Sequence, residues 1–162
     1  MKKFELTSEF ALSLFGVKLF RIKALVKFGD VDAGELGGYI EKEESLDQYG
    51  NAWVYGDAWV YGDARVYGDA RVYGNARVKK STHLFQLGAI GSRNEFTTFF
   101  RIKTNQIHVV CGCFFGSIED FEKVVQERHA GTKHEKTYLL AIELAKSQIE
   151  LDELTAEELT EE

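Results

Sequence analysis

Proline is absent from this 162-residue chain, and cysteine occurs only twice. Without proline, the turns must be made by glycine, asparagine and aspartate, which tolerate unusual backbone angles. Cys111 and Cys113 are one residue apart, a spacing at which a disulfide would be strained, so a disulfide-stapled fold is not expected. Long apolar runs are also missing, because the most apolar early run, residues 10–20, contains Lys18 and is too short to span a bilayer.

A secretory signal is not expected either, since Lys2 and Lys3 are not followed by a continuous apolar stretch. We therefore expect a cytoplasmic protein without a membrane-spanning segment. The net charge of −6 is concentrated at one end, because residues 150–162 hold seven acids and no base, which leaves the remainder at +1. We interpret residues 152–162 as a solvated acidic tail, with a tail that binds or repels a partner as the alternative.

A six-residue unit is repeated five times within residues 49–78. Alternate side chains of a strand share one face, so the alanine and valine of each Ala-x-Val unit are expected to point inward. The Gly-Asn or Gly-Asp pair before each alanine supplies a turn, and glycine at every sixth position opposes a helix. The inward positions are Ala52, Val54, Ala58, Val60, Ala64, Val66, Ala70, Val72, Ala76 and Val78.

This motif resembles that of the hexapeptide-repeat left-handed β-helix family. The resemblance implies that three units form one triangular coil, so that residues about 18 apart stack. Leu84 and Ile90 continue the six-residue spacing after Val78. Ile40 and Leu46 extend it on the N-terminal side, where the step of eight residues from Leu46 to Val54 indicates an insertion of two residues. We therefore predict a β-helix of about three coils over residues 37–90.

The stacking places aromatic side chains on the outer faces of the coils. Trp53 would lie beneath Arg71, Trp59 beneath Arg77, and Tyr55 beneath Tyr73. An exposed aromatic surface of this size favours subunit association. The resemblance to the hexapeptide-repeat family implies a homotrimer as the favoured assembly. A monomer in which tryptophan and arginine cover each other is the alternative. The interface candidates are Trp53, Tyr55, Trp59, Tyr61, Tyr67 and Tyr73.

The flanking segments predict two further parts of a mainly β protein. Residues 1–36 form an N-terminal β cap, in which residues 17–25 alternate as a strand does. Residues 91–151 form an α+β unit, with strands at 96–103 and 106–115. Two helices follow, the first capped by Ser117 and the second opened by the capping box Thr132-Lys-His-Glu.

Polar residues that suit an anion gather in the C-terminal unit. Backbone N–H groups at the start of the second helix can bind an anion, and arginine can hold a phosphate or carboxylate with two donors. We predict a site for a phosphate-bearing ligand, although the histidine and lysine could be merely solvated. The candidates are Ser92, Arg93, Thr97, His129, Lys133, His134 and Tyr138.

Other chemistries are less well supported. Zinc binding by Cys111, Cys113 and two histidines would need a wider cysteine spacing, so we expect no metal and no cofactor. A hexapeptide-repeat acyltransferase would need a histidine at a coil, and only His83 lies near one. A cysteine nucleophile with His129 is possible in principle but nothing in the sequence orders the pair. Arginines six residues apart lie on different faces, which makes nucleic-acid binding unlikely.

The overall layout is similar to that of uncharacterised phage and prophage hexapeptide-repeat proteins. Segments "GSRNEFTTFFR", "CGCFFGSIEDFEKVV" and "HAGTKHEKTYLLAIELAK" carry this resemblance, together with residues 19–58. It implies a phage accessory protein in an infected or lysogenic bacterium. We expect a non-enzymatic binding protein, with an anti-defence role in which it sequesters a nucleotide-type immune signal. The alternatives are an oligomeric scaffold that inhibits a host defence protein, and the acyltransferase.

Overall fold

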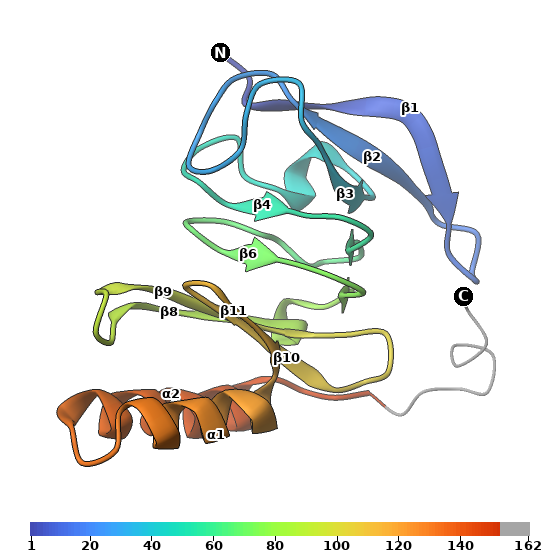
Figure 1. The fold of residues 1–162 in the computed structure, drawn as a ribbon. Helices are drawn as coiled ribbons and strands as arrows, with labels where there is room; N and C mark the ends of the chain where they lie inside the picture. Colours follow the sequence, from blue (N-terminus) through green and yellow to red (C-terminus); the bar gives the residue numbers. More distant parts are fainter. Residues whose placement is uncertain (153–162) are drawn as a thin grey trace.

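The computed structural model describes residues 1–152, and these form a β-rich upper part that rests on a sheet covered by two helices (Figure 1). The protein is therefore mainly β, with two helices near its C-terminal end. Among the described residues, no helix is long and apolar enough to cross a membrane.

The N-terminal strands continue directly into the repeats. Strands β1 (Phe4–Leu12) and β2 (Lys18–Ala24) form an antiparallel hairpin, and β2 also pairs antiparallel with β3 (Leu36–Ile40). From β3 the sheet passes to the two-residue strands β5 (Trp59–Val60) and β7 (Arg77–Val78), which run parallel to it. The sheet order is thus β1-β2-β3-β5-β7, so one wall of the repeats is an extension of the N-terminal hairpin.

The repeats stack with the predicted spacing of 18 residues. Strand β4 (Trp53–Val54) pairs parallel with β6 (Arg71–Val72), and β5 pairs with β7, each across 18 positions. Ile40 lies beside Val60 and Leu46 beside Val66, at a separation of 20, which agrees with the two-residue insertion inferred from the sequence. All ten repeat alanines and valines are buried, as expected.

Glycine is required at the corners of these coils. The repeat glycines have positive φ, and at Gly50 (φ 71°) an added Cβ would lie 2.7 Å from the carbonyl oxygen of Gly68 in the next coil. A side chain there would force neighbouring coils apart, because the backbones approach each other at the corner.

The C-terminal unit is an antiparallel sheet with both helices on one face. Its order is β11 (Phe114–Ser117), β10 (Ile107–Cys111), β9 (Glu95–Arg101) and β8 (Leu84–Ile90). Helix α1 (Ile118–Arg128) is capped by the Ser117 hydroxyl, and α2 (Lys133–Gln148) by that of Thr132, as predicted. The predicted second strand is divided into β10 and β11 by a turn at Gly112.

The predicted continuation of the coils through Leu84 and Ile90 is wrong. Both residues belong to β8, which pairs antiparallel with β9 instead of stacking on a coil. The physical reason lies in the turns, because the last Gly-Asx pair is Gly74-Asn75 and two lysines follow at the next corner. A short 3-10 turn at Ser81–His83 then redirects the chain into the C-terminal sheet.

The C-terminal sheet closes the lower end of the repeats. The Thr98 hydroxyl accepts a hydrogen bond from the backbone N–H of Arg71 at 3.1 Å, and Lys103 N–H donates to the Asn75 carbonyl at 2.9 Å. Phe100, Ile102 and Val110 join the core of the repeats from this side. A second core lies between the sheet and the helices, and it contains the predicted stripe of α2 and the residue after it: Tyr138, Ile142, Ala145 and Ile149.

The six aromatic residues predicted for a subunit interface differ in exposure. Trp53 is fully buried within the chain, because Phe4 and Phe28 cover its ring at centroid distances of 6.3 and 5.3 Å. The expectation that Trp53 faces another copy is therefore wrong. Tyr67 is 53% exposed, whereas Tyr55, Trp59, Tyr61 and Tyr73 are half-buried.

Of the two predicted ring–guanidinium stacks, the one between Trp59 and Arg77 is present, whereas Arg71 does not stack on Trp53. The Arg77 guanidinium lies 4.0 Å from the Trp59 ring centroid, as expected from the stacking. Arg71 reaches away from Trp53 and donates to the Gly112 carbonyl oxygen at 3.1 Å. Because the N-terminal cap already covers Trp53, Arg71 is free to tie the repeats to the C-terminal sheet.

Candidate functional site

A pocket of about 220 Å³ lies in the C-terminal unit, bordered by the β8–β9 turn, the β10–β11 turn and helix α1. Polar and charged groups occupy part of its rim, and aromatic and aliphatic side chains form the rest. The lining includes Ser92, Arg93, Glu95, Cys111, Cys113, Phe114, Phe121, Arg128, His129 and Tyr138.

Arg93 reaches the pocket from the tight turn between β8 and β9. Gly91 and Asn94 both have positive φ in this turn, at 79° and 53°. An added Cβ on Gly91 would collide with the Tyr138 hydroxyl, so the turn is packed closely on α2. The Arg93 guanidinium lies against Gly112, the residue between the two cysteines in the sequence.

The second basic edge of the pocket is the end of helix α1. Arg128 is the last residue of the helix, and His129 is its C-cap, with its backbone N–H bonded to the Val125 carbonyl at 2.9 Å. The His129 ring lies 5.4 Å from the Tyr138 ring and 5.9 Å from that of His134. Basic groups at a helix C-terminus interact favourably with its carbonyl end, which helps to hold this pair in place.

The apolar wall is built from packed aromatic rings. Phe121 lies 5.2 Å from Phe114 and 5.7 Å edge-on from Tyr138. Burial raises the pKa of Tyr138, and the neighbouring Cys111 thiol adds to the rise, so the phenol remains protonated near neutral pH. Its hydroxyl is already engaged by Cys111 and Ser92, so Tyr138 forms a fixed part of the pocket wall.

The sequence-predicted anion residues divide into two groups. Ser92, Arg93, His129 and Tyr138 line the pocket together. Thr97 is buried beneath it and donates to the Cys111 sulfur at 3.4 Å, while Lys133 and His134 do not line it. The start of α2 is capped internally by Thr132, so the expected contribution of its backbone N–H groups lies outside the pocket.

Sequence reasoning missed several pocket residues. Arg128 directly precedes His129 at the end of a predicted helix, which was a usable signal for a paired basic edge. Glu95, Phe114 and Phe121 gave no comparable signal. Cys111 and Cys113, both free thiols, were considered for zinc and for nucleophilic attack, but not as residues of the anion pocket.

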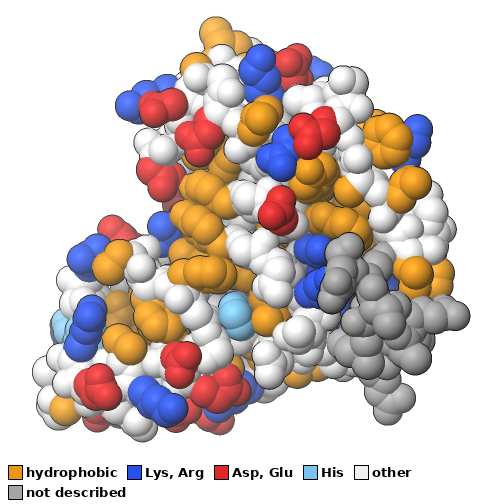
Figure 2. Space-filling model, turned by 45° about the vertical axis from the view of Figure 1, so that its right-hand side comes forward, with side chains coloured by type: hydrophobic (Ala, Val, Ile, Leu, Met, Phe, Trp, Pro, Cys, Tyr) orange, Lys and Arg blue, Asp and Glu red, His pale blue; other side chains and the backbone are white. Residues whose placement is uncertain are grey.

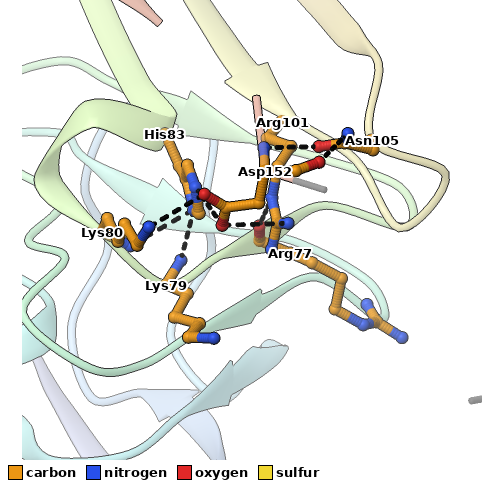
Figure 3. A network of polar contacts seen from close by, with 7 residues as sticks. All are labelled: Arg77, Lys79, Lys80, His83, Arg101, Asn105 and Asp152. Carbon is orange, nitrogen blue, oxygen red and sulfur yellow. Dashed lines mark hydrogen bonds and ion pairs between the residues drawn. The ribbon is translucent and has the colours of Figure 1, made fainter. Parts of the chain in front are cut away.

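A buried polar network near His83 forms a second cluster of ionisable groups (Figure 3). His83 Nε2 lies 3.0 Å from a carboxylate oxygen of Asp152, while Nδ1 accepts hydrogen bonds from the backbone N–H groups of Lys79 and Lys80. Lys80 contacts the other oxygen of Asp152 at 2.8 Å. Burial and the nearby Arg101 lower the pKa of His83 to about 4, so this imidazole is neutral at physiological pH.

This network fastens the chain after α2 to the junction of the two cores. Asn105 and Asp152 exchange hydrogen bonds, and Glu150 N–H donates to Thr82 at 3.2 Å. Asp152, assigned from sequence to the acidic tail, is thus fixed to the fold, and the remainder of that predicted tail lies outside the described residues. His83 has no exposed surface, so it is poorly placed to act as the catalytic base of an acyltransferase.

Within residues 1–152, no group of three or more histidine, cysteine or acidic side chains is arranged to hold a metal ion.

Comparison with known protein families relates the repeats to a β-solenoid family. The YdcK β-solenoid repeat matches residues 58–72, 64–80 and 70–84 in three overlapping registers. The match identifies the repeats as β-solenoid repeats, in agreement with their parallel stacking, but it covers only a small part of the chain. No curated protein matches the sequence.

Proposed function

We propose that this protein is a non-enzymatic binding protein whose C-terminal pocket takes a small anionic ligand. The observation that carries this proposal is the convergence of Arg93, Arg128 and His129 on one pocket. These residues come from a turn and a helix end that are far apart in sequence. Guanidinium groups form strong paired hydrogen bonds with phosphate and carboxylate, which makes such anions the best match.

The apolar wall favours an anion that also carries a flat ring. Half-buried Phe114 offers ring surface in the pocket, with buried Phe121 and Tyr138 packed in the same wall, and exposed Glu95 can accept hydrogen bonds from hydroxyl groups. A nucleotide combines all three features. The pocket volume of about 220 Å³ lies below the roughly 300–1,000 Å³ of typical ligand sites, so it suits one nucleotide unit of a larger messenger.

The scaffold and biological setting complete the proposal. The 18-residue stacking supports a short three-sided β-helix of a little over two coils, whose left-handed sense is what the resemblance of the repeat implies, and in which the N-terminal hairpin and C-terminal sheet protect the two ends. The resemblance to phage proteins favours a role in an infected bacterium, and we propose that the protein sequesters a nucleotide-type immune signal there. Exposed Tyr67 and half-buried Tyr55, Trp59, Tyr61 and Tyr73 leave aromatic surface for association into a trimer.

Calorimetry tests the binding proposal. The ligands are inorganic phosphate, 5′-mononucleotides, cyclic di- and trinucleotides, and ADP-ribose derivatives. We expect at least one nucleotide to bind, and Arg93→Gln to weaken its binding roughly tenfold or more, because one charge-assisted contact is lost. Arg65→Gln, at an exposed arginine of the repeats, is the matched control. Absence of binding across the panel contradicts the proposal.

A specific surface feature favours binding of a host protein as the second candidate. The β1–β2 hairpin exposes Phe10, Leu12 and Phe15 at 47%, 57% and 67%. Figure 1 shows this hairpin extending beside the repeats, and the surface in Figure 2 carries further hydrophobic side chains in a band beside a notch. Co-purification of a stoichiometric host protein that is lost in Phe15→Ser would favour this candidate.

A further inference from the structure

Two thiols share the pocket with its arginines. Cys111 ends β10 and Cys113 lies in the turn to β11, and both line the pocket. Gly112 between them has φ 57° and occupies the first central position of a two-residue hairpin turn, the arrangement of a type II′ turn. This turn brings the side chain of Cys113 to the surface, where it is exposed.

The turn is held between two guanidinium groups. Arg71 donates to the Gly112 carbonyl oxygen at 3.1 Å, and Arg93 packs against the same glycine from the pocket side. Arg128 adds a third positive charge across the pocket. A thiolate attacks disulfides, and positive groups nearby favour the approach of an anionic reagent.

We propose that Cys113 is a site of mixed-disulfide formation with small anionic disulfides, for which oxidised glutathione is the probe. The Cys113 thiol first loses its proton to solvent. Its thiolate then attacks one sulfur of the reagent, a new S–S bond forms, and the original S–S bond breaks. One glutathione leaves as a thiolate and takes up a proton, while the other remains on Cys113 with its carboxylates beside Arg93 and Arg128.

Cys111 is not the attacking group in this reaction. It is only partly exposed, and its sulfur accepts a hydrogen bond from the buried Thr97. The close spacing of the two cysteines also disfavours a second exchange that would join them directly. The bound glutathionyl group is therefore retained. This inference goes beyond the proposed function, because reversible anion binding requires neither thiol.

Intact-mass measurement over time tests the proposal with two reagents of opposite charge. Oxidised glutathione is anionic at neutral pH, and cystamine is a cationic disulfide. We expect one glutathionyl group per chain, on Cys113, added roughly tenfold faster than the cystamine-derived group because Arg93 and Arg128 line the same pocket as Cys113. Cys113→Ser should remove the adduct, and Cys111→Ser should retain it.

Charge variants at the rim separate attraction from simple exposure. Arg93→Gln should slow the reaction with oxidised glutathione and Glu95→Gln should accelerate it, whereas Arg65→Gln should leave the rate unchanged. Equal rates for the two reagents, faster reaction with cystamine, modification at Cys111, or no adduct would each overturn the proposal. Calorimetry on Cys113→Ser separates the mixed-disulfide proposal from the proposed function. Reversible anion binding should survive the substitution even though the thiol is lost.

Discussion

The rings of Tyr55 and Tyr73 lie parallel, 4.1 Å apart with 4° between their planes, at equivalent positions of two successive coils. The Tyr55 hydroxyl donates to Asp30 at 2.8 Å, and Phe115 of the C-terminal sheet approaches Tyr73 at 5.7 Å. Burial, reinforced by the bond to Asp30, raises the pKa of Tyr55. This ladder of rings therefore links the N-terminal loop, the repeats and the C-terminal sheet.

Removal of the central ring should weaken this link. Tyr73→Ala deletes the contacts with both Tyr55 and Phe115, and we expect it to lower the free energy of unfolding by roughly 2 kcal/mol, since the ring is half-buried. Denaturant titration measures the loss. Tyr67→Ala, at a 53% exposed ring of the same repeat type, is the control and should cost less than about 1 kcal/mol. Equal losses in the two variants would contradict a role for stacking.

The buried histidine predicts acid sensitivity. The pKa of His83 is lowered to about 4 in the folded protein, against about 6.5 in the unfolded chain. Between these values the unfolded state binds more protons, so stability should fall as pH drops from about 6.5 to 4. Partial burial of Asp152 opposes its ionisation, but its hydrogen bond with Lys80 lowers the pKa of this carboxyl below the ordinary value. Protonation of Asp152 should therefore reduce the free energy of unfolding further below about pH 4.

Urea unfolding at a series of pH values checks this prediction. In the window from pH 6.5 to 4, His83→Gln should show a shallower fall in unfolding free energy than the unmodified protein, whatever its absolute stability. His134→Gln, at a half-buried histidine in the first turn of α2, serves as the control. An unchanged slope in His83→Gln would mean that His83 does not titrate as inferred.

Lys3 predicts a change at alkaline pH. Its ammonium is almost fully buried and donates to the Ala52 carbonyl at 2.8 Å and to those of Tyr49 and Gly50 at 3.4 Å. Burial nevertheless lowers its pKa to about 8, against about 10.5 in the unfolded chain. The unfolded state thus binds more protons between pH 8 and 10.5, and stability should rise with pH in that window.

The contribution of Lys3 is measured by comparison with Lys3→Met. The difference in unfolding free energy between the two proteins should shift in favour of the unmodified chain as pH rises from 8 to 10.5. Lys2→Met, at the exposed neighbouring lysine, should show no such shift. A pH-independent difference for Lys3→Met would contradict a depressed pKa.

A comparison of two repeat glycines measures how much a side chain between neighbouring coils lowers the stability of the fold. Gly50 and Gly56 both have positive φ, but an added Cβ meets the Gly68 carbonyl oxygen at 2.7 Å only in the first case, and nothing within 4 Å in the second. Gly56→Ala should cost roughly 1 kcal/mol, from backbone strain alone. Gly50→Ala should cost clearly more, as measured by thermal unfolding. Equal costs would show that the coils separate without penalty.

The repeats could be predicted because their pattern is local. Six residues specify one strand and one turn, and the 18-residue register of Val54 with Val72 follows from the repetition. Trp53 could not be placed in the same way, since its burial depends on Phe4 and Phe28 from a cap that folds back over it. The departure at Leu84 likewise depends on competition between coil stacking and pairing with β9.

The pocket was predictable only in part for a similar reason. Arg93 and His129 carry recognisable chemistry, and their neighbours in sequence indicate a turn and a helix end. Their approach to each other requires the β10–β11 turn and α1 to pack on one side of the sheet. Asp152 could not be distinguished from the acids around it, because its partner His83 lies 69 positions earlier in the chain.

The continuous sheet from β1 to β7 also makes the repeats an adjustable spacer. The N-terminal hairpin ends the stack above and β9 supports it below, so neither end offers a free coil for further growth. Inserting or deleting 18 residues between these fixed ends would change the distance from hairpin to pocket by about 4.8 Å while leaving both intact. Chains of this design could thus vary the reach between two surfaces in steps of a single coil.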